Sequence, residues 1–138
     1  ALAGDTADAE RPVFEDEPFD DSFWSAEDAA AHFGVAKSTI TRKIKADELV
    51  GFKFFKNALY VPKEQVEGKT LVKGISDVLK MFNSEHYEAW QFLTADVFHG
   101  EPLPRPLDRL RSAKGDSLQD VLSEIKVAAK GYEIGDHM

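Results

Sequence analysis

The sequence predicts a mainly α-helical fold with one small β-hairpin, and three observations support this fold class. Two short helical patterns lie on either side of Gly34, and two runs of β-branched and aromatic residues lie on either side of Lys56-Asn57. Beyond Gly68, apolar residues recur at helical spacing. A length of 138 residues accommodates one ordinary domain, or a binding module of about 60 residues together with a small helical companion.

The first helix is expected over residues 26–33. Ser25 followed by Asp28 is a helix-start signal, because the serine hydroxyl accepts a hydrogen bond from a backbone amide of the first turn. Gly34 then supplies the positive φ with which helices commonly end. In the tight turn that follows, Val35 is expected to be buried.

The second helix is expected over residues 37–46. Ile40 and Ile44 lie about 40° apart on a helical wheel and define its buried stripe. The opposite side of the wheel is short, polar and cationic, and it consists of Ser38, Arg42 and Lys45. Thr39 and Thr41 lie on the flanks of this outward face.

A β-hairpin is expected next, with its strands within residues 49–55 and 58–61. Asn57 tolerates the left-handed conformation that a two-residue turn requires. Strand alternation sends Phe52 and Lys53 to opposite faces, so core packing is expected for Phe52.

Helical periodicity continues through the second half of the chain. Apolar residues at helical spacing indicate helices over about residues 75–82 and 87–94. A proline-rich link, residues 101–106, interrupts the pattern. A short turn of helix begins at Leu107, and a last amphipathic helix is expected over residues 118–129.

Trp90 and Phe92 lie about 200° apart on the wheel of one of these helices. Both are buried only if that helix is covered on two sides. The alternative is that one of them faces a protein partner or a second subunit, since aromatic residues are enriched in interfaces.

We divide the chain into three parts. Residues 1–21 show no helical or strand period and are interpreted as a disordered acidic tail. Residues 22–68 hold the helix pair, the hairpin and one helical turn over residues 63–66. Residues 69–138 form a small helical C-terminal domain.

The net charge of −8 conceals an uneven distribution. Residues 1–28 carry −9, residues 36–63 carry +5 and residues 64–138 carry −4. A basic segment therefore lies between two acidic ones, so the overall charge does not exclude a nucleic-acid partner.

Several other function classes find no support in the sequence. The chain has no cysteine, hence no disulfide or thiolate site, and a cytoplasmic location is expected. No apolar stretch approaches the roughly 18–20 residues that span a bilayer. The histidines are too far apart for a recognisable zinc motif, and no phosphate-binding loop or acid–base pair is evident. We expect no cofactor, no metal and no enzymatic activity.

The candidate DNA-binding residues lie on the second helix and the hairpin. The major groove of B-DNA admits one α-helix, where arginine can bond both acceptors of guanine, so Arg42 is the leading base-reading candidate. Hydroxyl groups reach base edges or phosphates, and lysines meet phosphates. The full set is Lys37, Ser38, Thr39, Thr41, Arg42, Lys43, Lys45, Lys53, Lys56 and Asn57. The alternatives are an ordinary solvated helix face, or aromatic stacking platforms for single strands.

The segment from Ser25 to Ile44, followed by Leu49 and by the hairpin that ends at Tyr60-Val-Pro-Lys63, resembles the winged helix-turn-helix of MerR-like and excisionase-like proteins. The resemblance implies that the helix holding Ser38–Lys45 is a recognition helix. It also implies that the hairpin is a wing, which braces that helix on the DNA backbone or minor groove.

Motifs of the second half resemble a small actinobacterial DNA-binding family, whose mycobacterial member is known as a substrate of the kinase PknL. They are Leu71-Val-Lys-Gly-Ile-Ser-Asp-Val-Leu79, Ala89-Trp-Gln-Phe-Leu-Thr-Ala-Asp96 and Arg105-Pro-Leu-Asp-Arg-Leu110. This resemblance implies a winged helix packed on a small helical C-terminal domain, and an actinobacterial source. The last two motifs also resemble the toxin-binding domain of antitoxins in the ParS/MbcA group.

These observations lead to two main functional hypotheses. The first is sequence-dependent binding of double-stranded DNA by a transcriptional regulator. The second is an antitoxin whose C-terminal half neutralises a toxin while the first half autoregulates its operon. The C-terminal domain is also a candidate surface for a homodimer. A third hypothesis, without DNA binding, is a phage-type architectural or protein-interaction module. The acidic tail is expected to compete with DNA phosphate for the basic segment, and Thr6 is a candidate site for a serine/threonine kinase.

Overall fold

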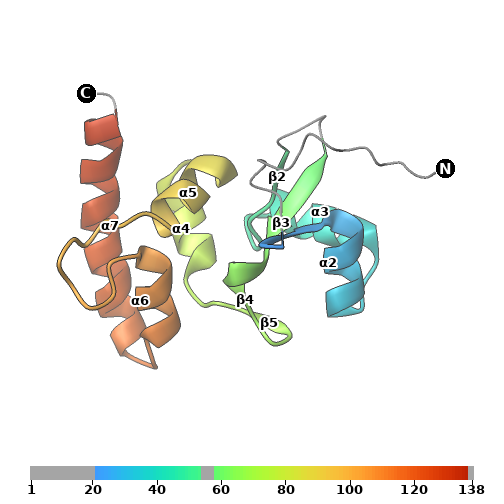
Figure 1. The fold of residues 1–138 in the computed structure, drawn as a ribbon, viewed down its shortest axis with the longest axis horizontal. Helices are drawn as coiled ribbons and strands as arrows, with labels where there is room; N and C mark the ends of the chain where they lie inside the picture. The colour runs from blue at the N-terminus through green and yellow to red at the C-terminus, as the bar shows by residue number, and fades with distance from the viewer. Residues whose placement is uncertain (1–20, 54–57, 137–138) are drawn as a thin grey trace.

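The computed structural model describes residues 21–53 and 58–136, and the side chains up to residue 132. Within these residues the fold is mainly α-helical, with a small antiparallel sheet (Figure 1). This is the fold class that the sequence predicts. No helix in the described ranges is long and apolar enough to cross a membrane.

The predicted helix pair is present as α2, Ala26–Phe33, and α3, Lys37–Lys45. The Ser25 side chain accepts a hydrogen bond from the Asp28 amide at 3.1 Å, and Gly34 ends α2 with a φ of 72°. The predicted helix-start signal at Ser25 and the predicted helix end at Gly34 are both confirmed.

Val35 lies in the turn between α2 and α3. The prediction that it is buried is wrong, because its side chain is 37% exposed. It lies at the wall of a surface cavity, while Ile40 and Leu49 take the buried positions beneath it.

The small sheet has the strand order β1-β3-β2. The predicted hairpin supplies β2, Phe52–Lys53, and β3, Leu59–Pro62, which pair antiparallel with Phe52 opposite Tyr60. Phe52 is buried and Lys53 exposed, as alternation predicts. The third strand, β1 (Phe23–Ser25), pairs with β3 and was not predicted, because its partner lies far along the chain.

The segment after the sheet contains the predicted helical turn, a 3-10 helix over Lys63–Gln65. Regular secondary structure does not end with this helical turn. It continues into a second small hairpin, β4 (Val66–Glu67) with β5 (Thr70–Leu71), whose turn places Gly68 at a φ of 67°.

The second half is helical, as its periodicity predicts, and consists of α4 (Ile75–Met81), α5 (His86–Leu93), α6 (Pro106–Ser112) and α7 (Ser117–Asp136). The proline-rich link ends with Pro106 as the first residue of α6, a position where the missing amide proton has no cost. Helix α7 runs beyond the predicted end at residue 129.

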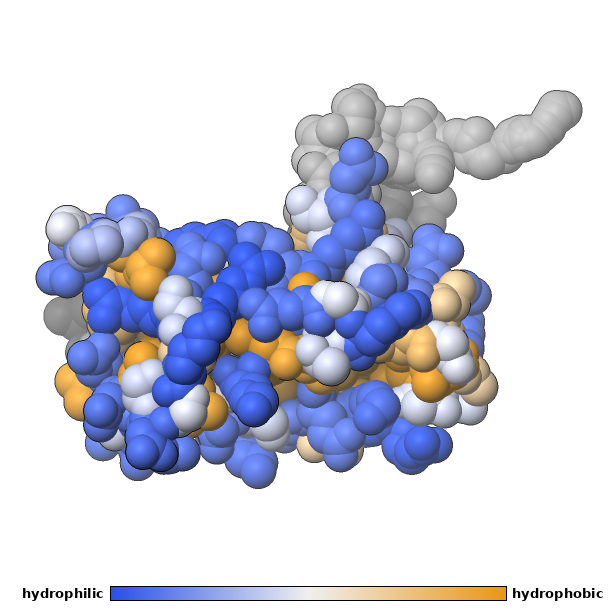
Figure 2. Space-filling view, turned by 90° about the horizontal axis from the view of Figure 1, so that it is seen from below, coloured by the Kyte–Doolittle hydropathy of each residue, from blue (hydrophilic) through white to orange (hydrophobic). Residues whose placement is uncertain are grey.

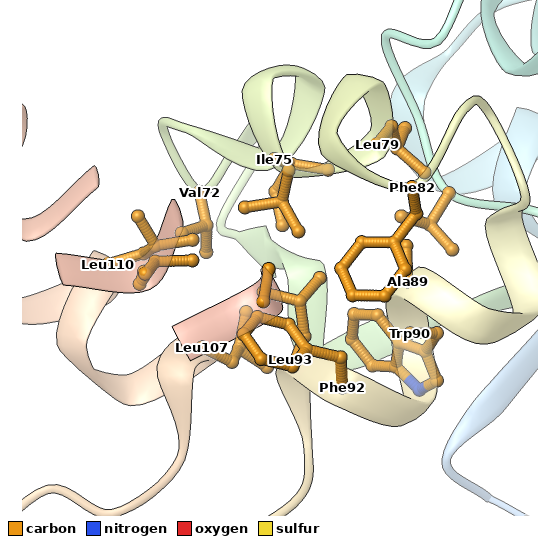
Figure 3. Close-up of a cluster of buried hydrophobic side chains, with 14 of the residues drawn as sticks. Val72, Ile75, Leu79, Phe82, Ala89, Trp90, Phe92, Leu93, Leu107 and Leu110 are labelled. Carbon is orange, nitrogen blue, oxygen red and sulfur yellow. The ribbon is translucent and has the colours of Figure 1, made fainter. Parts of the chain in front are cut away.

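The buried hydrophobic residues of the described ranges form two clusters. The first lies between α2, α3 and β3, and contains Ala29, Ile40, Ile44, Leu49 and Val61. The second lies among the helices of the C-terminal half (Figure 3). It also takes in Val50 and Phe52 from the chain that leads into the hairpin. The second cluster therefore joins both halves of the chain.

Trp90 and Phe92 are both buried, with exposed fractions of 7% and 0%. The alternative that one of them faces a partner is wrong for this structure. Both belong to the second cluster, where the Phe92 ring lies 5.1 Å from that of Phe82 and 5.2 Å from that of Tyr132. Helix α5 is thus covered on two sides.

Polar contacts also link the two halves. Arg105, at the start of α6, forms hydrogen bonds with both Glu64 carboxylate oxygens and with Asp108. The carboxylates of Asp108 and Glu64 raise the pKa of Arg105, and Arg105 lowers the pKa of Asp108. Arg111 adds a 2.8 Å hydrogen bond to the Glu64 carbonyl.

Candidate nucleic-acid interface

Helix α3 packs against α2 through one apolar side and presents the other to solvent. Ile40 and Ile44, 0% and 8% exposed, occupy the inner side as the helical wheel predicts. Ser38, Arg42 and Lys45 are exposed on the outer side. Neither Arg42 nor Lys45 has an ion pair among the residues that the structure describes, so both cations are available to a ligand.

Two other lysines of α3 have carboxylate partners. Lys37 lies 3.0 Å from a carboxylate oxygen of Glu27, and Lys43 lies 3.5 Å from one of Glu48. The hydrogen bond from Lys37 lowers the pKa of Glu27. Surface pairs of this kind contribute little to stability, so an anion such as phosphate can replace either carboxylate.

The remaining candidates differ in position. Thr39 and Thr41 are half-buried on the flanks of α3, and the Thr41 hydroxyl donates to the Lys37 carbonyl at 3.3 Å. Lys53 is exposed on β2. Lys56, Asn57, Thr6 and the acidic N-terminal segment up to residue 20 lie outside the described residues.

The tip of the β4–β5 hairpin is fastened to the end of α2, an arrangement that sequence reasoning missed. The Nε2 atom of His32 donates to the Gly68 carbonyl at 2.7 Å, and Lys69 donates to the His32 carbonyl. The indole of Trp24 stacks on His32 with ring centroids 4.5 Å apart. Two hydrogen bonds thus hold Gly68 and Lys69 beside the helix pair.

The segment between α3 and β2 is held by a second set of polar contacts, which we call the Asp47 cluster (Asp47, Gly51, Ser84 and His86). The Asp47 carboxylate accepts from the Ser84 hydroxyl and, at 3.0 Å, from His86 Nε2. The Gly51 amide donates to His86 Nδ1 at 3.2 Å, which leaves the imidazole proton on Nε2. The Ser84 hydrogen bond, followed by the contact with His86, lowers the pKa of Asp47.

The Asp47 cluster holds the segment that follows the C-terminus of α3 in place. Asp47 has a φ of 60°, a left-handed conformation that aspartate tolerates better than most residues. The sequence contains no local signal for the cluster, because Asp47 precedes the β2–β3 hairpin whereas Ser84 and His86 follow it.

The described residues contain no group of three or more His, Asp or Glu side chains that is close enough to hold a metal ion.

No family model matches this chain, and no curated protein matches it. Among solved structures, the NMR structure of Rv2175c superposes with a TM-score of 0.55 over 91% of this chain and 86% of that one, at 16% identity. Rv2175c is a mycobacterial protein of the PknL-substrate family, which the motifs of the second half resemble. At this identity the likeness establishes a shared fold alone.

Proposed function

We propose that this protein binds double-stranded DNA in a sequence-dependent manner and acts as a transcriptional regulator. In this proposal α2 and α3 form a helix-turn-helix, α3 is the recognition helix, and the β2–β3 hairpin is the wing. The observation that carries the proposal is the outward face of α3, where exposed Ser38, Arg42 and Lys45 lie opposite a buried isoleucine stripe.

The chemistry of that face matches the major groove. Arg42 can donate two hydrogen bonds to the O6 and N7 acceptors of one guanine, and Ser38 can reach a base edge or a phosphate. Lys37, Lys43 and Lys45 meet phosphates, which set the position of the helix without reading sequence. Lys53 extends this set of cations onto the hairpin.

The net charge of −8 is compatible with this proposal, because the cations are concentrated where they are needed. A segment of charge +5 contains α3 and the hairpin, and it provides the local positive potential that phosphate binding requires.

The alternative of an antitoxin finds no specific support in the structure. The two aromatic residues that suggested a partner surface, Trp90 and Phe92, are both buried. The shared fold with Rv2175c supports the arrangement of a helix pair and hairpin followed by a helical half, and adds nothing about the partner.

The test begins with selection of bound fragments from random DNA by the full chain, followed by affinity measurements on the selected site. We expect Arg42→Ala to weaken binding by about 1–3 kcal/mol and to relax selection at one base position. Lys45→Ala, in contrast, should weaken all sequences nearly equally and lower the slope of log affinity against log salt by about one unit.

The matched control is Lys126→Ala, which removes an exposed lysine of α7 far from α3 in the sequence. Far-UV circular dichroism verifies folding. If Arg42→Ala and Lys45→Ala bind as tightly as the control, α3 is not the recognition helix.

A further inference from the structure

A cavity of about 310 Å³ opens beside α3, under the turn that joins it to α2. Its apolar lining comes from the end of α2, the turn, α3, the segment after α3, and β5, and consists of Phe33, Val35, Ile40, Leu49 and Leu71. Two lysines, Lys43 and Lys69, complete the lining. This volume is at the lower end of the range for small-molecule sites.

The cavity has an apolar interior. Ile40 and Leu49 are fully buried and form its floor, Phe33 and Leu71 are half-buried, and Val35 is 37% exposed. Figure 2 shows hydrophobic surface between hydrophilic side chains on the half of the molecule that carries α2 and α3. Contact with a hydrocarbon group would remove this surface from water, which is favourable.

The charged residues that line the cavity are two lysines, and within the described part of the chain no carboxylate is among the lining residues. Among the residues that the structure describes, the ionic partner of Lys43 is the exposed Glu48, at 3.5 Å. Lys69 donates to the His32 carbonyl and has no carboxylate partner within the described residues. Two lysines beside an apolar floor are complementary to a molecule that is anionic at one end and apolar at the other.

We propose that this cavity binds a small organic carboxylate with a hydrocarbon body. The body contacts Ile40 and Leu49, and the carboxylate pairs with Lys43 and Lys69. The cavity is separate from the outward face of α3, but Lys43 lines the cavity and is also one of the proposed phosphate contacts.

The sharing of Lys43 has a regulatory consequence that rests on the proposed DNA binding. A carboxylate paired with Lys43 removes one phosphate contact and places negative charge beside the recognition helix. Occupancy of the cavity therefore weakens DNA binding, and DNA weakens carboxylate binding by the same factor.

The first experiment measures ligand binding without DNA, so that it is independent of the proposed function. Octanoate is titrated into the full chain and followed by NMR chemical shifts of methyl groups. We expect saturable binding with shifts at Val35, Leu49 and Leu71. Octylamine, which also has eight carbon atoms but carries the opposite charge, should not bind.

Two variants and their matched controls locate the site. Val35→Phe fills the cavity, and Lys69→Gln removes a cation; each should weaken octanoate at least tenfold. Val127→Phe makes the same change at a valine of α7 that is 73% exposed, and Lys126→Gln removes an exposed lysine outside the cavity. Both controls should bind octanoate like the unaltered chain.

The proposal is overturned if octanoate does not bind, if octylamine binds equally well, or if Lys69→Gln has no effect. The lysine variant leaves the apolar core intact, so the test does not depend on whether Val35→Phe folds.

The second experiment measures affinity for the selected DNA site with and without saturating octanoate. We expect a severalfold loss of affinity in the unaltered chain and a much smaller loss in Lys69→Gln at the same octanoate concentration. Unchanged DNA affinity at full occupancy would refute the regulatory consequence. A chain that binds octanoate but no DNA would refute the proposed function and leave the ligand site standing.

Discussion

At the scale of single residues, Gln65 shows how one side chain can organise several segments. It is fully buried, its Nε2 donates to the carbonyls of Val50 and Pro62 at 2.8 and 3.0 Å, and its Oε1 accepts from the Val50 amide at 2.8 Å. Each bond satisfies a backbone group that packing has removed from water. Gln65 thereby joins the chain before β2 to the end of β3.

We expect Gln65→Leu to destabilise the protein by about 3 kcal/mol or more, because it leaves one amide and two carbonyls buried without partners. Urea denaturation gives the free energy of unfolding. Gln119→Leu, the same change at an exposed position of α7, should alter it by less than about 0.5 kcal/mol. Similar losses in the two variants would show that the buried hydrogen bonds contribute nothing specific.

Asp47 is expected to make the stability of the protein depend on pH in the acid range. Its folded pKa is lowered by the Ser84 hydrogen bond and by His86, so it lies below the unfolded value of about 4. The stabilisation is therefore complete above pH of about 4 and is lost as the pH falls through the lower, folded pKa.

We expect Asp47→Asn to cost about 1–3 kcal/mol at neutral pH, where hydrogen bonds to a charged carboxylate are lost. The difference from the unaltered chain should shrink as the pH falls below about 4. Thermal unfolding between neutral and acid pH measures it. Asp116→Asn, at an exposed position outside the cluster, is the control. A difference that stays constant down to the lowest pH would exclude Asp47 as the titrating group.

At the scale of elements, the position of α3 depends on its contact with Gly51. A Cβ atom at Gly51 would lie 2.3 Å from Cδ1 and 2.8 Å from Cγ1 of Ile44, the second residue of the buried stripe. A side chain at residue 51 would therefore push α3 away from the segment that leads to β2.

Gly51→Ala should destabilise the protein by about 1–3 kcal/mol through overpacking. Ile44→Val removes Cδ1, the atom closest to the added methyl group, and should by itself cost about 0.5–1.5 kcal/mol. We expect the double variant to lose less than the sum of the two single losses, as measured by denaturation. Strict additivity would mean that the two residues do not compete for the same space.

At the scale of the whole molecule, the two hydrophobic clusters behave as parts of one folded unit. Val50 and Phe52 carry the second cluster into the first half of the chain. The Asp47 cluster and the bonds between Arg105 and Glu64 add polar links across the same junction. Separation of the two halves would expose the apolar side chains of the second cluster and the polar groups that form these links to water.

The two tryptophans test this coupling, because Trp24 packs against the first cluster and Trp90 belongs to the second. The variants Trp24→Phe and Trp90→Phe each retain one tryptophan as a fluorescent probe. In each variant the urea transition seen by fluorescence should superimpose on that seen by far-UV circular dichroism. Two separated transitions in either variant would show that the halves unfold independently.

The sequence by itself determined the helices and the character of the α3 surface. Capping residues, a glycine at a left-handed position and apolar spacing act within a few residues, so α2 and α3 could be predicted nearly to the residue. The cationic outward face followed from the same periodicity, because the buried stripe of Ile40 and Ile44 leaves the opposite side to solvent.

Only the tertiary structure decided the features that depend on segments far apart in the chain. Strand β1 exists through its pairing with β3, Gln65 and Asp47 find their partners on other elements, and α5 is buried on both sides by helices that follow and precede it. Val35 was placed wrongly for the same reason. Whether a side chain near a turn is covered depends on which distant segment packs there, and at Val35 the nearby β5 leaves a cavity open.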